Sequence, residues 1–81
     1  MITPDMTLKL MEQFKKEMDD VLKYRELQKA TDDEYLEEAL EEIEHDEHLH
    51  AKFLHSYLLE HGVYKPAEHV ECEKKWAMIN D

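Results

Sequence analysis

The chain has 81 residues, of which 42% are hydrophobic, one is glycine and two are prolines. This composition favours one small helical domain spanning residues 1–81, which is short for building a core alone, so self-association is expected. Ten basic and 21 acidic residues give a net charge of −11. Such a surface disfavours nucleic acid and anionic membranes as partners and concentrates cations nearby.

The sequence carries no pattern typical of export or membrane insertion. It has no apolar run of about 18 residues or more, and no basic segment followed by an apolar one at the N-terminus. Its single cysteine, Cys72, has no partner for a disulfide within the chain, as is common in a reducing compartment. We therefore expect a cytoplasmic protein, either free or held inside a protein nanocompartment.

The first helix is predicted over residues 4–30. Thr3 is a favourable N-cap, and Pro4 suits the first helical position because its missing N–H would have no partner there. Apolar residues then recur every three or four positions, which is typical of a helix with one buried stripe. The stripe consists of Leu10, Phe14, Val21 and Tyr24.

The second helix is predicted over residues 32–61. Thr31 and Glu34 have the spacing of a capping box, in which each side chain accepts from the other residue's backbone N–H. Gly62 suits the left-handed position that ends a helix. The apolar seam between these ends consists of Leu36, Leu40, Ile43, Leu54, Tyr57 and His61.

A short C-terminal helix is predicted over residues 66–79, opening at Pro66. Its expected docking residues are Val70, Trp76, Ala77 and Ile79. His69 and Cys72 share one face of this helix, but two ligands do not make a zinc site. The fold prediction is therefore all-α: an antiparallel hairpin about 40 Å long with a short tail helix. A second hairpin would complete a four-helix bundle.

Three polar residues interrupt the apolar seams of the two long helices. Glu17 replaces an apolar residue in the first, and Glu47 and His50 do so in the second. Glu17 lies 15 residues before Asp32 and Glu47 lies 15 residues after it. In an antiparallel hairpin that turns there, both carboxylates stand at the same level, with His50 one turn away on the same face.

This arrangement predicts a metal site. An unpaired carboxylate buried in a seam would cost several kcal/mol, and a divalent cation would compensate it. One Glu from one helix and Glu-x-x-His from the next form half of the di-iron carboxylate site known from helical bundles. Two hairpins related by a twofold axis would supply four Glu and two His. Mn or Zn can substitute for Fe at such ligands.

The stretch "DEHLHAKFL", residues 46–54, resembles the second-helix metal motif of the ferritin and rubrerythrin superfamily. The chain most resembles the encapsulated-ferritin family over residues 10–61, because Glu17, Tyr24, Glu47 and His50 fit that family's spacing. The resemblance implies a ferritin-like four-helix bundle made by two subunits. It also implies ferroxidase activity, in which Fe(II) is oxidised at the shared site for iron storage or detoxification.

The same resemblance implies a homodimer or higher homo-oligomer, with a shell or storage-compartment protein as a further partner. It assigns Tyr24 to hydrogen bonding or electron supply near the irons, although Tyr24 also fits as a core aromatic residue. Glu44, one turn before Glu47, is either a further metal ligand, a hydrogen-bond partner of a ligand, or solvated. His45, His48 and His55 are expected to face solvent, and His61 is expected to cap its helix.

Two other functions remain open at this point. One is a rubrerythrin-like peroxide reductase, which the absence of paired Cys-x-x-Cys motifs makes less favoured. The other is a metal-free helical interaction module, in which the polar residues fix how helices pair.

Overall fold

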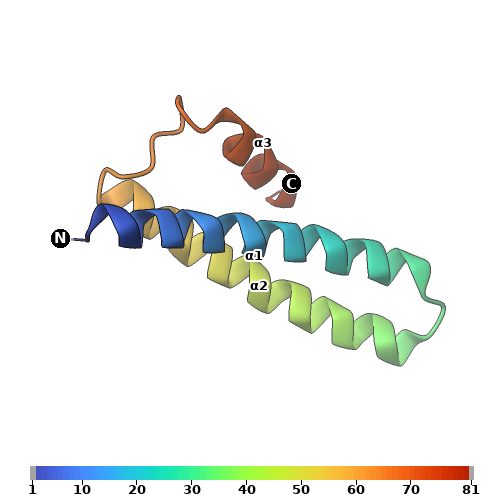
Figure 1. Ribbon diagram of the computed structural model, residues 1–81. Coiled ribbons are helices and arrows are strands. Elements are labelled where there is room, and N and C mark those ends of the chain that lie inside the picture. Colours follow the sequence, from blue (N-terminus) through green and yellow to red (C-terminus); the bar gives the residue numbers. More distant parts are fainter. Residues whose placement is uncertain (1, 81) are drawn as a thin grey trace.

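The computed structural model describes residues 2–80, which form three helices and no strand (Figure 1). The helices are α1 (Pro4–Ala30), α2 (Glu34–Glu60) and α3 (Val70–Ile79). α1 and α2 lie antiparallel and side by side, and α3 lies along one side of the hairpin. The chain measures 45 × 21 × 16 Å, as a hairpin of two 27-residue helices requires. The all-α prediction is confirmed.

None of the helices within residues 2–80 combines the length and the hydropathy that crossing a membrane requires. α1 begins and ends as predicted. The Thr3 hydroxyl accepts a hydrogen bond from the backbone N–H of Met6 at 3.0 Å, and Pro4 occupies the first turn.

The start of α2 differs from the prediction. Asp33 is the N-cap, and its carboxylate accepts hydrogen bonds from the backbone N–H groups of Tyr35 at 2.9 Å and Leu36 at 3.2 Å. Thr31 instead accepts from the N–H of Asp33 at 3.1 Å. The predicted capping box of Thr31 and Glu34 is therefore wrong. A carboxylate at the N-cap also interacts favourably with the helix dipole, which a hydroxyl cannot do.

The end of α2 follows the prediction. The imidazole of His61 lies 2.9 Å from the carbonyl oxygen of Tyr57, and Gly62 adopts a φ of 66°. The tail helix, in contrast, begins at Val70 rather than at Pro66. Residues 66–68 form only a turn, because the next residue, His69, has a non-helical backbone and stacks on Tyr64 with ring centroids 5.0 Å apart.

The core lies between the hairpin and α3. Phe14 is at its centre, with its ring centroid 5.8 Å from those of both Tyr64 and Trp76. Of the predicted docking residues of α3, Ile79 is fully buried and Trp76 packs against the core, whereas Val70 and Ala77 are exposed. The buried residues of this core cluster are Phe14, Met18, Val21, Ala51, Leu58, Tyr64, Cys72 and Ile79.

Polar contacts fasten α3 to the hairpin. The Arg25 guanidinium donates to the carbonyl oxygens of Ile79 at 2.6 Å and Met78 at 3.3 Å, which are orphan acceptors at the end of α3. Lys75 forms an ion pair with Asp19 on α1. One side of the hairpin is thus covered by α3.

No helix among residues 2–80 covers the other side of the hairpin, and we call that side the open face. At about 100° per residue, Glu17 and His50 lie about 160° around their helices from Asp19 and His48, which contact Lys75 and Asn80, so both lie on this side. Leu36 and Ile43, predicted in the seam, are 45% and 40% exposed there, so a single chain does not bury them. The apolar residues of the open face are Met6, Leu10, Tyr24, Leu27, Leu36, Ile43, Phe53, Leu54 and Tyr57.

Candidate metal centre

Three side chains converge at the middle of the hairpin. Glu17 comes from α1, and Glu47 and His50 come from successive turns of α2. Each offers one ligand atom, and these atoms lie within 4.8 Å of one another. His50 Nδ1 is 3.6 Å from a Glu17 oxygen and 4.0 Å from a Glu47 oxygen. The predicted convergence of these three residues is confirmed.

His50 Nδ1 lies farther from the two carboxylates, at 3.6 and 4.0 Å, than a direct hydrogen bond allows. Hydrogen bonds between such atoms are about 2.7–3.2 Å long. Two ligand atoms that are each about 2.1 Å from one metal ion lie about 3–3.5 Å apart, so small side-chain rotations would close the set around an ion. Among residues 2–80, no other group of three His, Cys, Asp or Glu side chains has this geometry.

The two oxygens of Glu17 differ in their surroundings. The Gln13 side-chain amide donates a hydrogen bond to Glu17 Oε1 at 2.7 Å. Glu17 Oε2 is buried and has no hydrogen-bond partner of fixed geometry among residues 2–80. A buried carboxylate oxygen without a donor is costly, so this atom calls for a proton or a cation.

The pKa values of the two carboxyl groups move apart. A hydrogen bond with Glu17, burial, and the charges of Glu17 and Asp20 raise the pKa of Glu47 to about 7. Burial also raises the pKa of Glu17, but hydrogen bonds from Glu47 and Gln13, together with His50, outweigh it and leave this pKa below its usual range. The pair therefore shares one proton, which Glu47 carries and donates toward Glu17.

Glu44 lies one turn before Glu47 but is held elsewhere. Its carboxylate accepts from Arg25 Nε at 3.1 Å and from Gln28 Nε2 at 2.8 Å, one donor on each oxygen. The Glu44 side chain is 18% exposed, and metal ligation by Glu44 would require these two contacts to break. Tyr24 is half-buried on the open face, two turns from Glu17, and its functional role stays a prediction.

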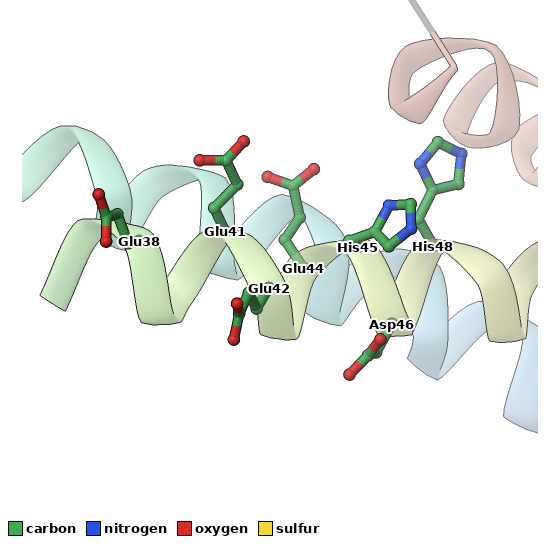
Figure 2. A pocket seen from close by; sticks show the side chains of 7 residues that line it. All are labelled: Glu38, Glu41, Glu42, Glu44, His45, Asp46 and His48. Atoms are coloured by element: carbon green, nitrogen blue, oxygen red, sulfur yellow. The ribbon is translucent and has the colours of Figure 1, made fainter. Parts of the chain in front are cut away.

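The seven acidic and histidine side chains of residues 38–48 other than Glu47 do not form a second centre. They line a shallow hollow in which Glu41, Glu44 and His48 extend toward the α3 side, whereas Glu42 and Asp46 extend the opposite way (Figure 2). Because the side chains diverge, they cannot place their ligand atoms around one ion.

The prediction that three histidines face solvent is confirmed only for His45, which is exposed. His48 Nε2 lies 3.0 Å from the side-chain oxygen of Asn80. His55 is wrong as a solvent-facing residue: its ring stacks on Trp76 at 4.5 Å, and its Nε2 lies 3.1 Å from Glu73. Both residues lie beneath α3, whose docking position the seam pattern did not include.

Sequence reasoning missed two residues beside the centre. Gln13 binds Glu17 directly, and Asp20 contributes negative charge at Glu47. Both could have been found by spacing, since they lie four residues before and three residues after Glu17, on the same helix face.

Comparisons with known proteins give no family assignment: no family model, curated protein or solved structure matches the chain. The resemblance to encapsulated ferritins rests on the spacing of Glu17, Tyr24, Glu47 and His50. The chemical argument rests on the arrangement of Glu17, Glu47 and His50 in the hairpin.

Proposed function

We propose that this chain binds Fe(II) through Glu17, Glu47 and His50 and oxidises it at a centre shared between two copies. One observation carries the proposal: Glu17 Oε2 is buried without a donor and faces an imidazole and a second carboxyl group. Two oxygen ligands and one nitrogen ligand suit Fe(II), Mn(II) or Zn(II).

The open face supports the participation of a second copy. The His50 side chain is 59% exposed there, so its ring is accessible from outside the chain. Apolar residues flank the centre on both sides along the hairpin; toward one end, Phe53 and Leu54 face Met6 and Leu10 across a groove. Because α3 lies on the opposite side, a second hairpin can cover the open face without displacing it (Figure 1). Burying such a surface favours association.

One chain supplies three ligands, which leaves coordination positions of an ion unfilled. A twofold axis through the open face would bring four Glu and two His together, enough for two ions. Fe(II) is the substrate. Anionic oxygen ligands stabilise Fe(III) relative to Fe(II), so the Glu17 and Glu47 carboxylates favour loss of an electron to O₂ or peroxide. Glu47 gives up its proton as the ion binds.

The acidic surface raises the local concentration of Fe(II) around the centre. A hairpin of 45 × 21 × 16 Å is too small to enclose a mineral core. Storage of the ferric product therefore needs a larger homo-oligomer or a shell protein, and we propose such an assembly as the partner.

An anaerobic Fe(II) titration tests the proposal. Wild type, Glu47→Ala and Glu42→Ala are compared, the last as a control because Glu42 is an exposed carboxylate of the same helix. We expect wild type and Glu42→Ala to bind one Fe(II) per chain, and Glu47→Ala to bind at least tenfold more weakly. Equal binding by all three proteins would refute the iron centre.

A metal-free interaction module is the second candidate, and the shared proton favours it. Protonated Glu47 can satisfy Glu17 without any metal, so the polar group could serve only to align two hairpins. In that case Glu47→Ala changes oligomerisation but not iron binding. If iron binds, oxidation rates with O₂ and with peroxide separate a ferroxidase from a peroxide reductase.

A further inference from the structure

The two glutamines of α1 make the same kind of contact in different places. Gln13 donates to Glu17 at 2.7 Å, inside the candidate metal centre, and Gln28 donates to Glu44 at 2.8 Å, outside it. Both contacts join a neutral amide to a carboxylate oxygen. Because of this difference in location, only Gln13 can affect the candidate metal centre directly.

Gln13 sets which oxygen of Glu17 is free. Its amide occupies Oε1, and Oε2 is left buried and unpaired, 3.6 Å from His50 Nδ1. A carboxylate held at one oxygen loses most of its rotational freedom, so its second oxygen keeps a fixed direction toward Glu47 and His50.

An amide is well suited to this task. It supplies a donor without a charge, so it orients the carboxylate but does not neutralise it. A lysine or arginine there would pair with Glu17 and compete with an incoming cation. Gln13 is itself exposed on the helix surface and lies outside the core, so packing does not explain its contact with Glu17.

We propose that Gln13 is a positioning residue of the metal centre: it holds Glu17 by Oε1 and thereby directs Oε2 at the bound ion. This inference rests on the proposed metal-binding function. Hydrogen-bond partners of metal ligands typically change metal affinity 10- to 100-fold, and an effect at the lower end, about tenfold, fits an exposed donor.

The test compares Gln13→Ala with Gln28→Ala, using Co(II) as the probe. Co(II) has visible absorption bands that change with the number and geometry of its ligands, so one titration gives both affinity and coordination. We expect Gln13→Ala to bind Co(II) about tenfold more weakly, with altered bands. We expect Gln28→Ala to match wild type in both, and sedimentation to show the same oligomeric state for all three proteins.

Two results would overturn the inference, and they are distinguishable from failure of the metal centre. If Gln13→Ala retains the affinity and bands of wild type, Gln13 does not position Glu17, although the centre stands. If Gln13→Ala and Gln28→Ala weaken binding equally, the effect is general to α1 and the inference also fails. Only if wild type binds Co(II) no better than Glu47→Ala does the metal centre fail together with it.

Discussion

At the residue scale, Glu47 is the side chain whose state decides what the centre can do. Its pKa of about 7 means that a proton and a metal ion compete for the same carboxyl group near neutral pH. The proton on Glu47 should therefore oppose cation binding in acidic solution, and its loss should permit cation binding in mildly basic solution.

Metal affinity should consequently depend on pH. Below pH 7, binding must displace the proton of Glu47, so the apparent affinity for Co(II) should fall about tenfold per pH unit. Titrations at pH 6, 7 and 8 measure this dependence. An affinity that does not change between pH 6 and 7 would contradict proton displacement from Glu47.

The protonation of Glu47 should also make the stability of the metal-free protein depend on pH. Because folding raises the pKa of Glu47 above 4.5, this group stabilises the fold most at low pH, and the contribution is lost as pH rises to about 7 and beyond. Glu47→Gln keeps a donor for Glu17 at every pH. It should therefore raise the stability at pH 8 by about 1 kcal/mol, a value discounted for partial solvent exposure, or ~4–8 °C in Tm.

The advantage of Glu47→Gln should vanish near pH 4, where Glu47 is protonated in both the folded and the unfolded states. Thermal melts by circular dichroism at pH 4 and pH 8 test this, with the exposed Glu42→Gln as control. Destabilisation by Glu47→Gln at pH 8 would show that no proton is shared.

Candidate site residues could be predicted from the sequence where they interrupt a regular apolar pattern. Glu17, Glu47 and His50 interrupt apolar seams, and equal distances from the turn bring them together. Gln13 breaks no pattern, because a glutamine on a helix surface is ordinary. Its role depends on which Glu17 oxygen it reaches, and only side-chain geometry gives that.

At the element scale, the Arg25 guanidinium joins the end of α3 to both long helices. Arg25 joins α1 to two carbonyl oxygens at the end of α3 and to Glu44 on α2. Since hydrogen bonds to charged groups contribute about 1.5–3 kcal/mol when buried, this residue is expected to hold a large share of the energy that docks α3.

Arg25→Ala should loosen α3 and leave the metal centre intact. We expect faster hydrogen exchange of α3 amides and a changed emission of Trp76, which stacks on His55 beneath this helix. Lys23→Ala, which removes an exposed basic residue of the same helix, is the control. Unchanged Co(II) affinity would confirm that the two sides of the hairpin act separately, whereas unchanged exchange of α3 would contradict the anchor.

The elements themselves were predictable to the extent that their signals are local. Thr3 and Gly62 act within one turn, and both ends that they mark are as predicted. The start of α2 was misplaced because Thr31 and Asp33 are both good caps and the sequence alone does not rank them. Sequence reasoning found Trp76 and Ile79 as docking residues of α3, but not its anchor on Arg25, because Arg25 binds backbone carbonyls, which every residue has.

At the scale of the whole molecule, the hairpin has one covered and one uncovered side, and the centre lies on the uncovered one. A four-helix bundle made by two copies would bury the exposed apolar residues of the open face. The sequence places Leu36 and Ile43 in the apolar seam of the second helix, which predicts that they are buried. In one chain they are exposed, so a partner is needed to bury them.

A charge on the open face should therefore prevent association. Phe53 is 58% exposed beside the groove with Leu54, and Phe53→Glu would place a carboxylate in the proposed interface. Val70→Glu is the matched control, since Val70 is 50% exposed but lies on α3. Sedimentation velocity should give a monomer for Phe53→Glu and the wild-type state for Val70→Glu, with Co(II) affinity reduced at least tenfold in the monomer alone. Identical behaviour of both variants would exclude the open face as the interface.

The place where α3 ends has a practical consequence for handling the protein. Its last turn is fastened to the covered side of the hairpin, whereas Ile2 at the other end of the chain lines the groove of the open face. A purification tag or fluorescent fusion joined after α3 should leave the groove free, and one joined before Ile2 should lie beside it. A chain tethered to a sensor surface on the α3 side should therefore still capture a second copy from solution, and one tethered beside Ile2 should not.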